Sequence, residues 1–212
     1  ISPAGTKWGD HYRKHIKDYY AAVTGVDEQF GRILEALKEQ GLEDNTIVVF
    51  TSDHGDCIGT HEFVTKNNYF EEAFNIPLLI RYPQKLEPRT DELLLSVPDL
   101  YPTFLELMGM GNLIPDEVEG ISYADYLLTG EGETPSSQLY MKIPYGEPTK
   151  GDRGVRNKRY TYVVQKMEDD KIDVVLFDRQ KDPYQLNNIA KENKQLVDEL
   201  NSELLEWLNK TD

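Results

Sequence analysis

The chain has 212 residues, of which 39% are hydrophobic and 29% are charged, and its formal net charge is −15. This length suits one or two domains of about 150 residues each and allows a substantial hydrophobic core. The negative charge argues against nucleic acid and anionic membrane surfaces as partners, and no apolar run approaches the roughly 20 residues of a membrane span.

The first part of the chain alternates between a helical and an extended pattern. Apolar residues three and four positions apart predict an amphipathic helix over residues 13–40, which Gly41 ends. Two apolar runs, 46–51 and 76–82, predict strands. Helix and strand in alternation predict a parallel sheet with helical crossovers. The connection between the strands, residues 52–75, is long and polar, which is typical of a functional loop.

The second part changes pattern after a linker. A short helix is predicted to begin at Asp99, and another at residues 121–129, followed by linker composition over 130–137. Strands are predicted at 138–143, 154–164 and 172–178, with a hairpin turn at 167–171. Leucines at four-residue spacing near the end predict a helix that packs on this small antiparallel sheet. We therefore predict an α/β region at 1–132 and a small α+β subdomain at 133–212.

Asp53 and His54 stand side by side where the first predicted strand ends. Ligands of open α/β sheets bind beyond the carboxyl ends of the strands, so this pair could hold a metal, although it could equally cap neighbouring backbone groups. Gly55 then lets the chain turn away. Lys66 follows on the same loop, and a metal ligand with a nearby cation suits an anionic ester, whose charge must be stabilised in the transition state.

These residues also carry a family resemblance. The ordered segments Thr51-Ser-Asp-His-Gly-Asp56, Gly59, His61, Lys66, Tyr69-Phe-Glu-Glu72 and Ile76-Pro-Leu-Leu79 resemble the sulfatase branch of the alkaline phosphatase superfamily. Gly154-Val-Arg156, Leu176-Phe-Asp178 and Asp182-Pro183 are similar to sulfatase carboxyl-terminal signatures. The resemblance implies part of an alkaline-phosphatase-like α/β sheet with helical crossovers, plus a small antiparallel sheet packed with a terminal helix. Residues 1–132 would then be the C-terminal part of the catalytic domain.

The resemblance implies roles for four residues. Asp53 and His54 would be two ligands of a calcium ion, with Mg²⁺, Mn²⁺ or Zn²⁺ less favoured, although imidazole suits zinc or manganese better than calcium. Lys66 would be catalytic and would bind a sulfate oxygen. His61 either lines the substrate pocket or is structural, and both readings stay open. By composition, Glu71 and Glu72 are expected to be solvated, and Cys57 to be a small packing residue.

Some family features are absent from the chain. A sulfatase nucleophile is a formylglycine made from Cys or Ser within Cys/Ser-x-Pro/Ala-x-Arg, whereas Cys57-Ile-Gly-Thr-His61 has neither the proline nor the arginine. The one adjacent aspartate pair, Asp169-Asp170, falls in the predicted hairpin turn. We therefore expect a C-terminal portion that lacks the formylglycine segment and is inactive alone. Its partner would be the missing N-terminal part of the same protein.

Three functions follow from this reading. The parent protein would hydrolyse a small-molecule or carbohydrate sulfate ester, and the resemblance implies export to the periplasm or the extracellular space. A phosphonate monoester or phosphodiester hydrolase of the same superfamily would share Asp53, His54 and Lys66. A noncatalytic binding module would explain the missing nucleophile, but it would not need to keep all three residues.

Overall fold

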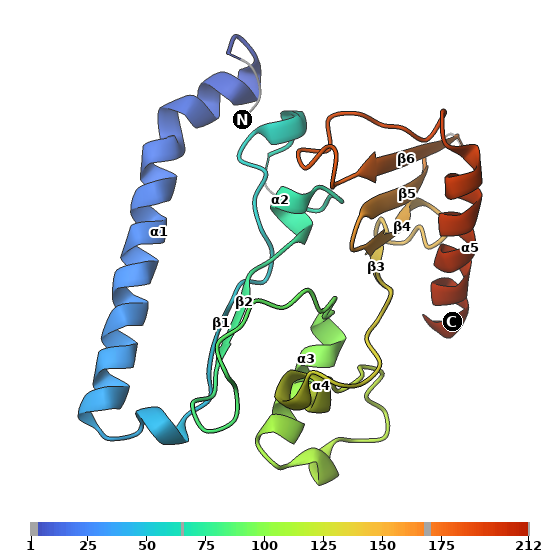
Figure 1. Ribbon diagram of the computed structural model, residues 1–212. Coiled ribbons are helices and arrows are strands. Elements are labelled where there is room, and N and C mark those ends of the chain that lie inside the picture. Colours follow the sequence, from blue (N-terminus) through green and yellow to red (C-terminus); the bar gives the residue numbers. More distant parts are fainter. Residues whose placement is uncertain (1–3, 65, 168–170, 212) are drawn as a thin grey trace. The chain divides into compact units, whose positions relative to one another are not determined.

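The computed structural model describes residues 4–64, 66–167 and 171–211 (Figure 1). The chain divides into two compact units, Ile1–Glu87 and Pro88–Asp212. The first unit combines a long helix with a two-stranded sheet, and the second combines three helices of six or more residues with a four-stranded sheet. The mixed α/β class is thus confirmed, while the domain boundary expected near residue 132 stays a prediction.

Helix α1, Lys7–Glu39, dominates the first unit. It begins six residues before the predicted start because Thr6 caps it, with Oγ1 accepting the backbone N–H of Gly9 at 3.1 Å. It ends at Glu39, Gln40 is its C-cap residue, and Gly41 follows with φ +66°. Phe30 of α1 contacts Phe50 of strand β1, Val48–Thr51, with ring centroids 5.0 Å apart. The amphipathic pattern therefore predicted the helix, and Phe30 is one of its apolar residues that meets the strand.

Strand β1 pairs with β2, Leu78–Arg81, in the antiparallel direction, with Val48 opposite Arg81 and Thr51 opposite Leu78. The predicted parallel arrangement is wrong for this pair. Parallel neighbours need a crossover connection, usually an α-helix. In the described part of the connection, the α-helix present is α2, Glu71–Phe74, which is a single turn. The chain therefore returns alongside the strand that it left.

Two helices open the second unit. Helix α3, Val97–Leu107, begins at Ser96, whose backbone N–H donates to Oδ2 of Asp99 at 2.9 Å in a capping box. Helix α4 spans Ala124–Thr129 and ends at Gly130, which has φ +76°. Both helices occur where the sequence predicts them, within three residues at the start. No helix in the described part of the chain is long and apolar enough to cross a membrane.

The four-stranded sheet is an antiparallel meander of β3 Ser137–Lys142, β4 Gly151–Asn157, β5 Tyr160–Lys166 and β6 Ile172–Asp178, in that order. The single strand predicted at 154–164 is in fact two. Oδ1 of Asn157 accepts the backbone N–H of Arg159 at 2.9 Å and of Tyr160 at 2.7 Å, and this side-chain turn reverses the chain.

The hairpin turn predicted at 167–171 joins β5 and β6. The backbone N–H of Met167 donates to the carbonyl oxygen of Lys171 at 2.9 Å, which closes the hairpin. Residues 168–170, including Asp169 and Asp170, lie outside the described residues.

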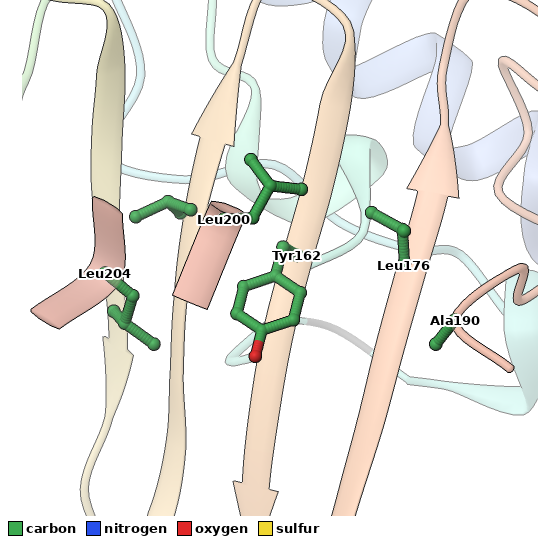
Figure 2. Packing of buried hydrophobic residues seen from close by; sticks show 6 residues of the cluster. Tyr162, Leu176, Ala190, Leu200 and Leu204 are labelled. Carbon is green, nitrogen blue, oxygen red and sulfur yellow. The ribbon is translucent and has the colours of Figure 1, made fainter. Parts of the chain in front are cut away.

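Helix α5, Lys194–Thr211, packs on one face of this sheet, as predicted (Figure 2). Leu200 and Leu204 of the helix meet Tyr162 and Leu176 of the strands, and each of the four side chains is at most 4% exposed. The phenol of Tyr162 donates to Oδ1 of Asn201 at 3.2 Å, so the buried ring keeps a partner for its hydroxyl. This cluster is the main core of the second unit.

Candidate functional site

The predicted metal ligands, Asp53 and His54, follow the end of β1 at Thr51 after a single intervening residue. Oδ1 of Asp53 accepts the backbone N–H of His54 at 2.9 Å, and Oδ2 lies 3.3 Å from Nε2 of His54. The Asp53 side chain is 82% exposed and the His54 side chain 34%. Some desolvation opposes ionisation of Asp53, but the His54 N–H and the charge of Lys66 hold the pKa of this carboxyl below its ordinary value. The carboxylate is therefore ionised and open to solvent.

The hydrogen bonds of His54 assign its tautomer. Nδ1 lies 2.6 Å from the carbonyl oxygen of Gly55, an acceptor, so Nδ1 carries the proton. Nε2 lies 2.7 Å from Nζ of Lys66, and since an ammonium group can only donate, Nε2 is the acceptor. The ring is therefore neutral, and its contact with Asp53 is not an ion pair. Metal-binding histidines typically have one ring nitrogen fixed by a carbonyl, as Nδ1 is here, and use the lone pair of the other, which in this structure accepts from Lys66.

The two side chains fit a divalent cation but do not complete its coordination. An ionised carboxylate and a neutral Nε2, 3.3 Å from each other, both suit a metal ion. Calcium takes about six to eight ligands, most of them oxygens. Among residues 4–64, 66–167 and 171–211, no group of three or more His, Cys, Asp and Glu side chains could hold a metal. Asp53 and His54 alone would therefore leave a calcium ion short of ligands.

Gly55 fixes the ligand segment against α2. Its N–H donates to the carbonyl oxygen of Ala73 at 3.0 Å. A Cβ at position 55 would lie 1.9 Å from the carbonyl oxygen of Glu72. The position thus needs glycine because a backbone packs directly against it, and its φ is not positive. The sequence suggested that Gly55 serves a turn, and the structure shows that glycine is needed there because of close packing.

The loop that carries Lys66 has an unusual backbone conformation. Four of its non-glycine residues have positive φ: Ile58 at 47°, His61 at 55°, Glu62 at 59° and Asn67 at 64°. For a β-branched residue such as Ile58 this conformation is a genuine outlier. Oδ1 of Asp56 accepts the N–H of Ile58 at 2.8 Å and supports it locally. Strain of this kind gathers at functional sites, where the surroundings enforce it.

His61 lies inside the first unit, against an aromatic ring. Its ring stacks on Phe70, with centroids 3.6 Å apart and planes at 3°, and its side chain is 8% exposed. Nε2 lies 3.4 Å from Oε2 of Glu72 without hydrogen-bond geometry. Whether this residue also borders a substrate pocket stays a prediction.

Glu72 is less exposed to solvent than the composition of the chain led us to expect, since its side chain is 29% exposed. Burial opposes its ionisation, but interactions with His61, a backbone N–H and the Thr60 side chain together keep the pKa of Glu72 below its ordinary value. The sequence contains no local signal for this contact, because eleven positions separate the two residues along the chain.

Cys57 is a packing residue, as expected. The thiol is 1% exposed, and Sγ accepts from Nδ2 of Asn68 at 3.3 Å. Burial raises the pKa of the Cys57 thiol, so it is a poor nucleophile.

A cavity of about 360 Å³ in the first unit lies away from this chemistry. It is apolar and is lined by Phe30 and Leu34 of α1 and by Phe50 and Leu79 of the strands. None of the four predicted site residues lines it. The cavity is thus a gap in helix–sheet packing, and the predicted site residues, on the loop after β1, lie outside its lining.

Comparisons with known proteins agree on one family. The family model described as "Sulfatase" matches residues 3–110, and the model described as "N-sulphoglucosamine sulphohydrolase, C-terminal" matches residues 59–211. An endo-4-O-sulfatase of Bacteroides thetaiotaomicron is 42% identical over 93% of this chain and 42% of its own length. An N-acetylglucosamine-6-O-sulfatase of the same species is 32% identical over 88% of this chain and 35% of its own length. The chain thus spans about two fifths of the length of these relatives.

Solved structures show the same likeness. A Bacteroides fragilis protein described as a candidate sulfatase has a TM-score of 0.92 at 45% identity, covering 100% of this chain and 46% of its own. A phosphonate monoester hydrolase of Agrobacterium radiobacter has a TM-score of 0.74 at 29% identity, covering 89% of this chain and 40% of its own.

Proposed function

Because this chain belongs to the sulfatase family, we propose that the protein containing it hydrolyses sulfate monoesters. The main observation behind the proposal is that the ammonium group of Lys66 lies beside the two predicted metal ligands, Asp53 and His54. Nζ of Lys66 lies 2.7 Å from Nε2 of His54, which itself lies 3.3 Å from Oδ2 of Asp53. An ionised carboxylate, a neutral imidazole and an ammonium group at one point suit a metal-bound anion. A noncatalytic module would have no need of this arrangement.

Asp53 and His54 would hold the metal, with calcium as the preferred ion. The carboxylate oxygens and Nε2 are their donor atoms, and the remaining ligands would come from the part of the protein outside this chain, from the substrate or from water. When bound, a divalent cation neutralises negative charge on the sulfate oxygens. Mg²⁺, Mn²⁺ and Zn²⁺ are the alternatives, and His54 is the reason to test them.

The ammonium group of Lys66 can contact either Nε2 of His54 or a sulfate oxygen of the substrate. Nε2 of His54 has one lone pair, so it cannot accept a hydrogen bond from Lys66 and bind a metal at the same time. When His54 acts as a ligand, the ammonium group of Lys66 is released from it and remains beside the site. There it can donate to a sulfate oxygen and stabilise the charge that develops in the transition state.

The nucleophile would lie outside this chain, in a formylglycine segment. Within the chain, Cys57 is buried and outside the required motif, so it does not offer one. The missing N-terminal part of the protein would supply this residue and the other ligands, so these 212 residues would be inactive alone. The apolar residues of α1 that remain exposed support a partner of this kind, with Tyr20, Val23, Val26 and Ile33 each more than half exposed.

The substrate would be a sulfated carbohydrate. Two relatives named above are an endo-4-O-sulfatase and an N-acetylglucosamine-6-O-sulfatase, and an ulvan-active sulfatase of Formosa agariphila is 34% identical over 99% of this chain and 40% of its own length. Export to the periplasm or the extracellular space stays a prediction.

Two substitutions in the intact protein test the proposal. Lys66→Ala should lower kcat for an aryl sulfate about a hundredfold or more, because a transition-state contact is lost. Asp53→Ala should lower kcat and also weaken calcium binding, which titration calorimetry measures directly. Asp27→Ala, on α1, is the control and should change neither. Unchanged kinetics in both site variants would exclude this site as the catalytic one.

A second candidate function has structural support. The phosphonate monoester hydrolase named above aligns over most of this chain, and Asp53, His54 and Lys66 do not by themselves separate a sulfate from a phosphonate ester. Parallel assays of phenyl phosphonate and an aryl sulfate on the intact protein decide between them. A larger kcat/KM for the phosphonate would replace the sulfatase assignment.

A further inference from the structure

The buried contact between His61 and Glu72 joins two segments that both serve the site. His61 belongs to the loop that carries Lys66, and Glu72 belongs to α2. Nε2 and Oε2 lie 3.4 Å apart, and the side chains are 8% and 29% exposed. The imidazole is also pressed flat against Phe70, 3.6 Å between centroids. This contact is therefore shielded from water, and a polar contact inside a protein is electrostatically stronger than one at the surface.

Helix α2 also contacts the ligand segment. The carbonyl oxygen of Ala73 accepts the N–H of Gly55, and the Glu72 carbonyl lies where a Cβ of Gly55 would be. Gly55 directly follows the two predicted metal ligands. One turn of helix thus holds the ligand segment through its backbone and the lysine loop through the Glu72 side chain.

The lysine loop needs such a restraint. Non-glycine residues with positive φ persist only where the surroundings enforce them, and His61, Glu62 and Asn67 are three of those in this loop. Asn67 directly follows Lys66, so the direction in which the lysine leaves the loop depends on a conformation that must be maintained. The imidazole of His61 ties this stretch to Glu72 of α2 and to Phe70, the residue that precedes the helix.

We propose that His61 and Glu72 are positioning residues that hold the Lys66 loop against α2 and so keep Nζ of Lys66 beside His54. This inference rests on the proposed function, in which Lys66 contacts the sulfate group. In this role neither residue needs to contact the substrate. Their effect on turnover passes through Lys66, and this property separates a positioning role from a general contribution to stability.

The first experiment measures kinetics of the intact protein with an aryl sulfate. His61→Gln and Glu72→Gln are each made in the wild type and in Lys66→Ala. In the wild type, each should lower kcat about tenfold to a hundredfold with little change in KM, because the lysine is misplaced in the transition state. In Lys66→Ala, neither should lower kcat further. An equal loss in both backgrounds, or no loss in the wild type, would overturn the proposal.

A matched control comes from α1, where His15 and Asp18 form an exposed pair with Nδ1 and Oδ2 3.5 Å apart. His15→Gln removes a histidine from a similar carboxylate contact and should leave kcat unchanged. These experiments also distinguish a failure of the proposed function from a failure of the positioning role. If Lys66→Ala keeps full activity, the proposed function fails; if Lys66→Ala is impaired and Glu72→Gln is not, the positioning role alone fails.

A second experiment does not depend on activity. Hydrogen exchange should report the amides of Thr60 and Phe63, which donate within the loop to the carbonyls of Cys57 and Thr60 at 2.8 and 2.9 Å. In Glu72→Gln, these amides should exchange faster while those of the β4–β5 ladder keep their protection. Faster exchange throughout the protein would show a general stability role and overturn the proposal, as would unchanged exchange in the loop.

Discussion

Replacing Gly55 by Ala should separate the metal ligands from the helix that supports them. In the structure, the added Cβ would lie 1.9 Å from the carbonyl oxygen of Glu72 and 2.9 Å from its carbonyl carbon. Both atoms belong to the backbone, so no side chain can rotate to make room. Either the ligand segment or α2 must move.

The size of the movement follows from these distances. A carbon and a carbonyl oxygen settle at about 3.3 Å or more, so the two backbones must part by roughly 1.4 Å. This would stretch the 3.0 Å hydrogen bond from Gly55 to Ala73 beyond bonding range. Overpacking costs about 1–3 kcal/mol and the lost hydrogen bond about 1 kcal/mol more. Calcium affinity should also fall about tenfold to a hundredfold, as it does when residues that orient metal ligands are changed.

Thermal unfolding and calcium titration of the intact protein measure both effects. The control is Gly31→Ala, on α1, where a built Cβ meets no atom within 4 Å. Alanine in a helix interior is favoured over glycine by about 1 kcal/mol, so this variant should be as stable as the wild type or more so. If Gly55→Ala bound calcium and unfolded like the wild type, the close approach to Glu72 would not restrain the ligand segment.

Two further predictions concern the second unit. The Asp178 carboxylate accepts two hydrogen bonds from Arg159, at 3.1 and 2.7 Å, which hold its pKa below the ordinary value. Its stabilising contribution is therefore present above the unfolded pKa of about 3.9 and is lost as the pH falls through the lower folded pKa. Asp178→Asn should lower the Tm at pH 7 and weaken the fall of Tm on acidification; parallel curves would argue against the pair. Leu204→Ala, in a core position that is 3% exposed, should cost about 2–5 kcal/mol in denaturant unfolding. Leu205→Ala, at a position 51% exposed, should stay within about 0.5 kcal/mol, and equal losses would contradict the packing in Figure 2.

Features with a local cause could be predicted from the sequence. The periodicities of α1 and α5 reflect which side of each helix is apolar, and the capping pair Ser96 and Asp99 lies within four residues. Asp53 and His54 could be singled out because an apolar run, 46–51, ends just before them. For Lys66, spacing alone indicated only a nearby cation, and the structure brings its ammonium group to His54.

Features that depend on contacts between distant residues could not be predicted. Whether β1 and β2 run parallel or antiparallel depends on the path of the connection, and an apolar run looks the same in both cases. The strand break at Asn157 depends on one side chain bonding the backbone two and three residues later, against a pattern that remains strand-like. The stacking of His61 on Phe70 has no counterpart in spacing or composition, so a structural and a substrate-binding role could not be separated.

The burial of Cys57 gives the protein an internal reporter of loop opening. The thiol is 1% exposed beside Asn68, between the ligand segment and the lysine loop, so an alkylating reagent can reach it only when that part of the fold opens. The rate at which the peptide containing Cys57 becomes labelled therefore measures how often the loop departs from its closed form. Because the thiol exists naturally at this position, that rate can be followed without altering a single residue.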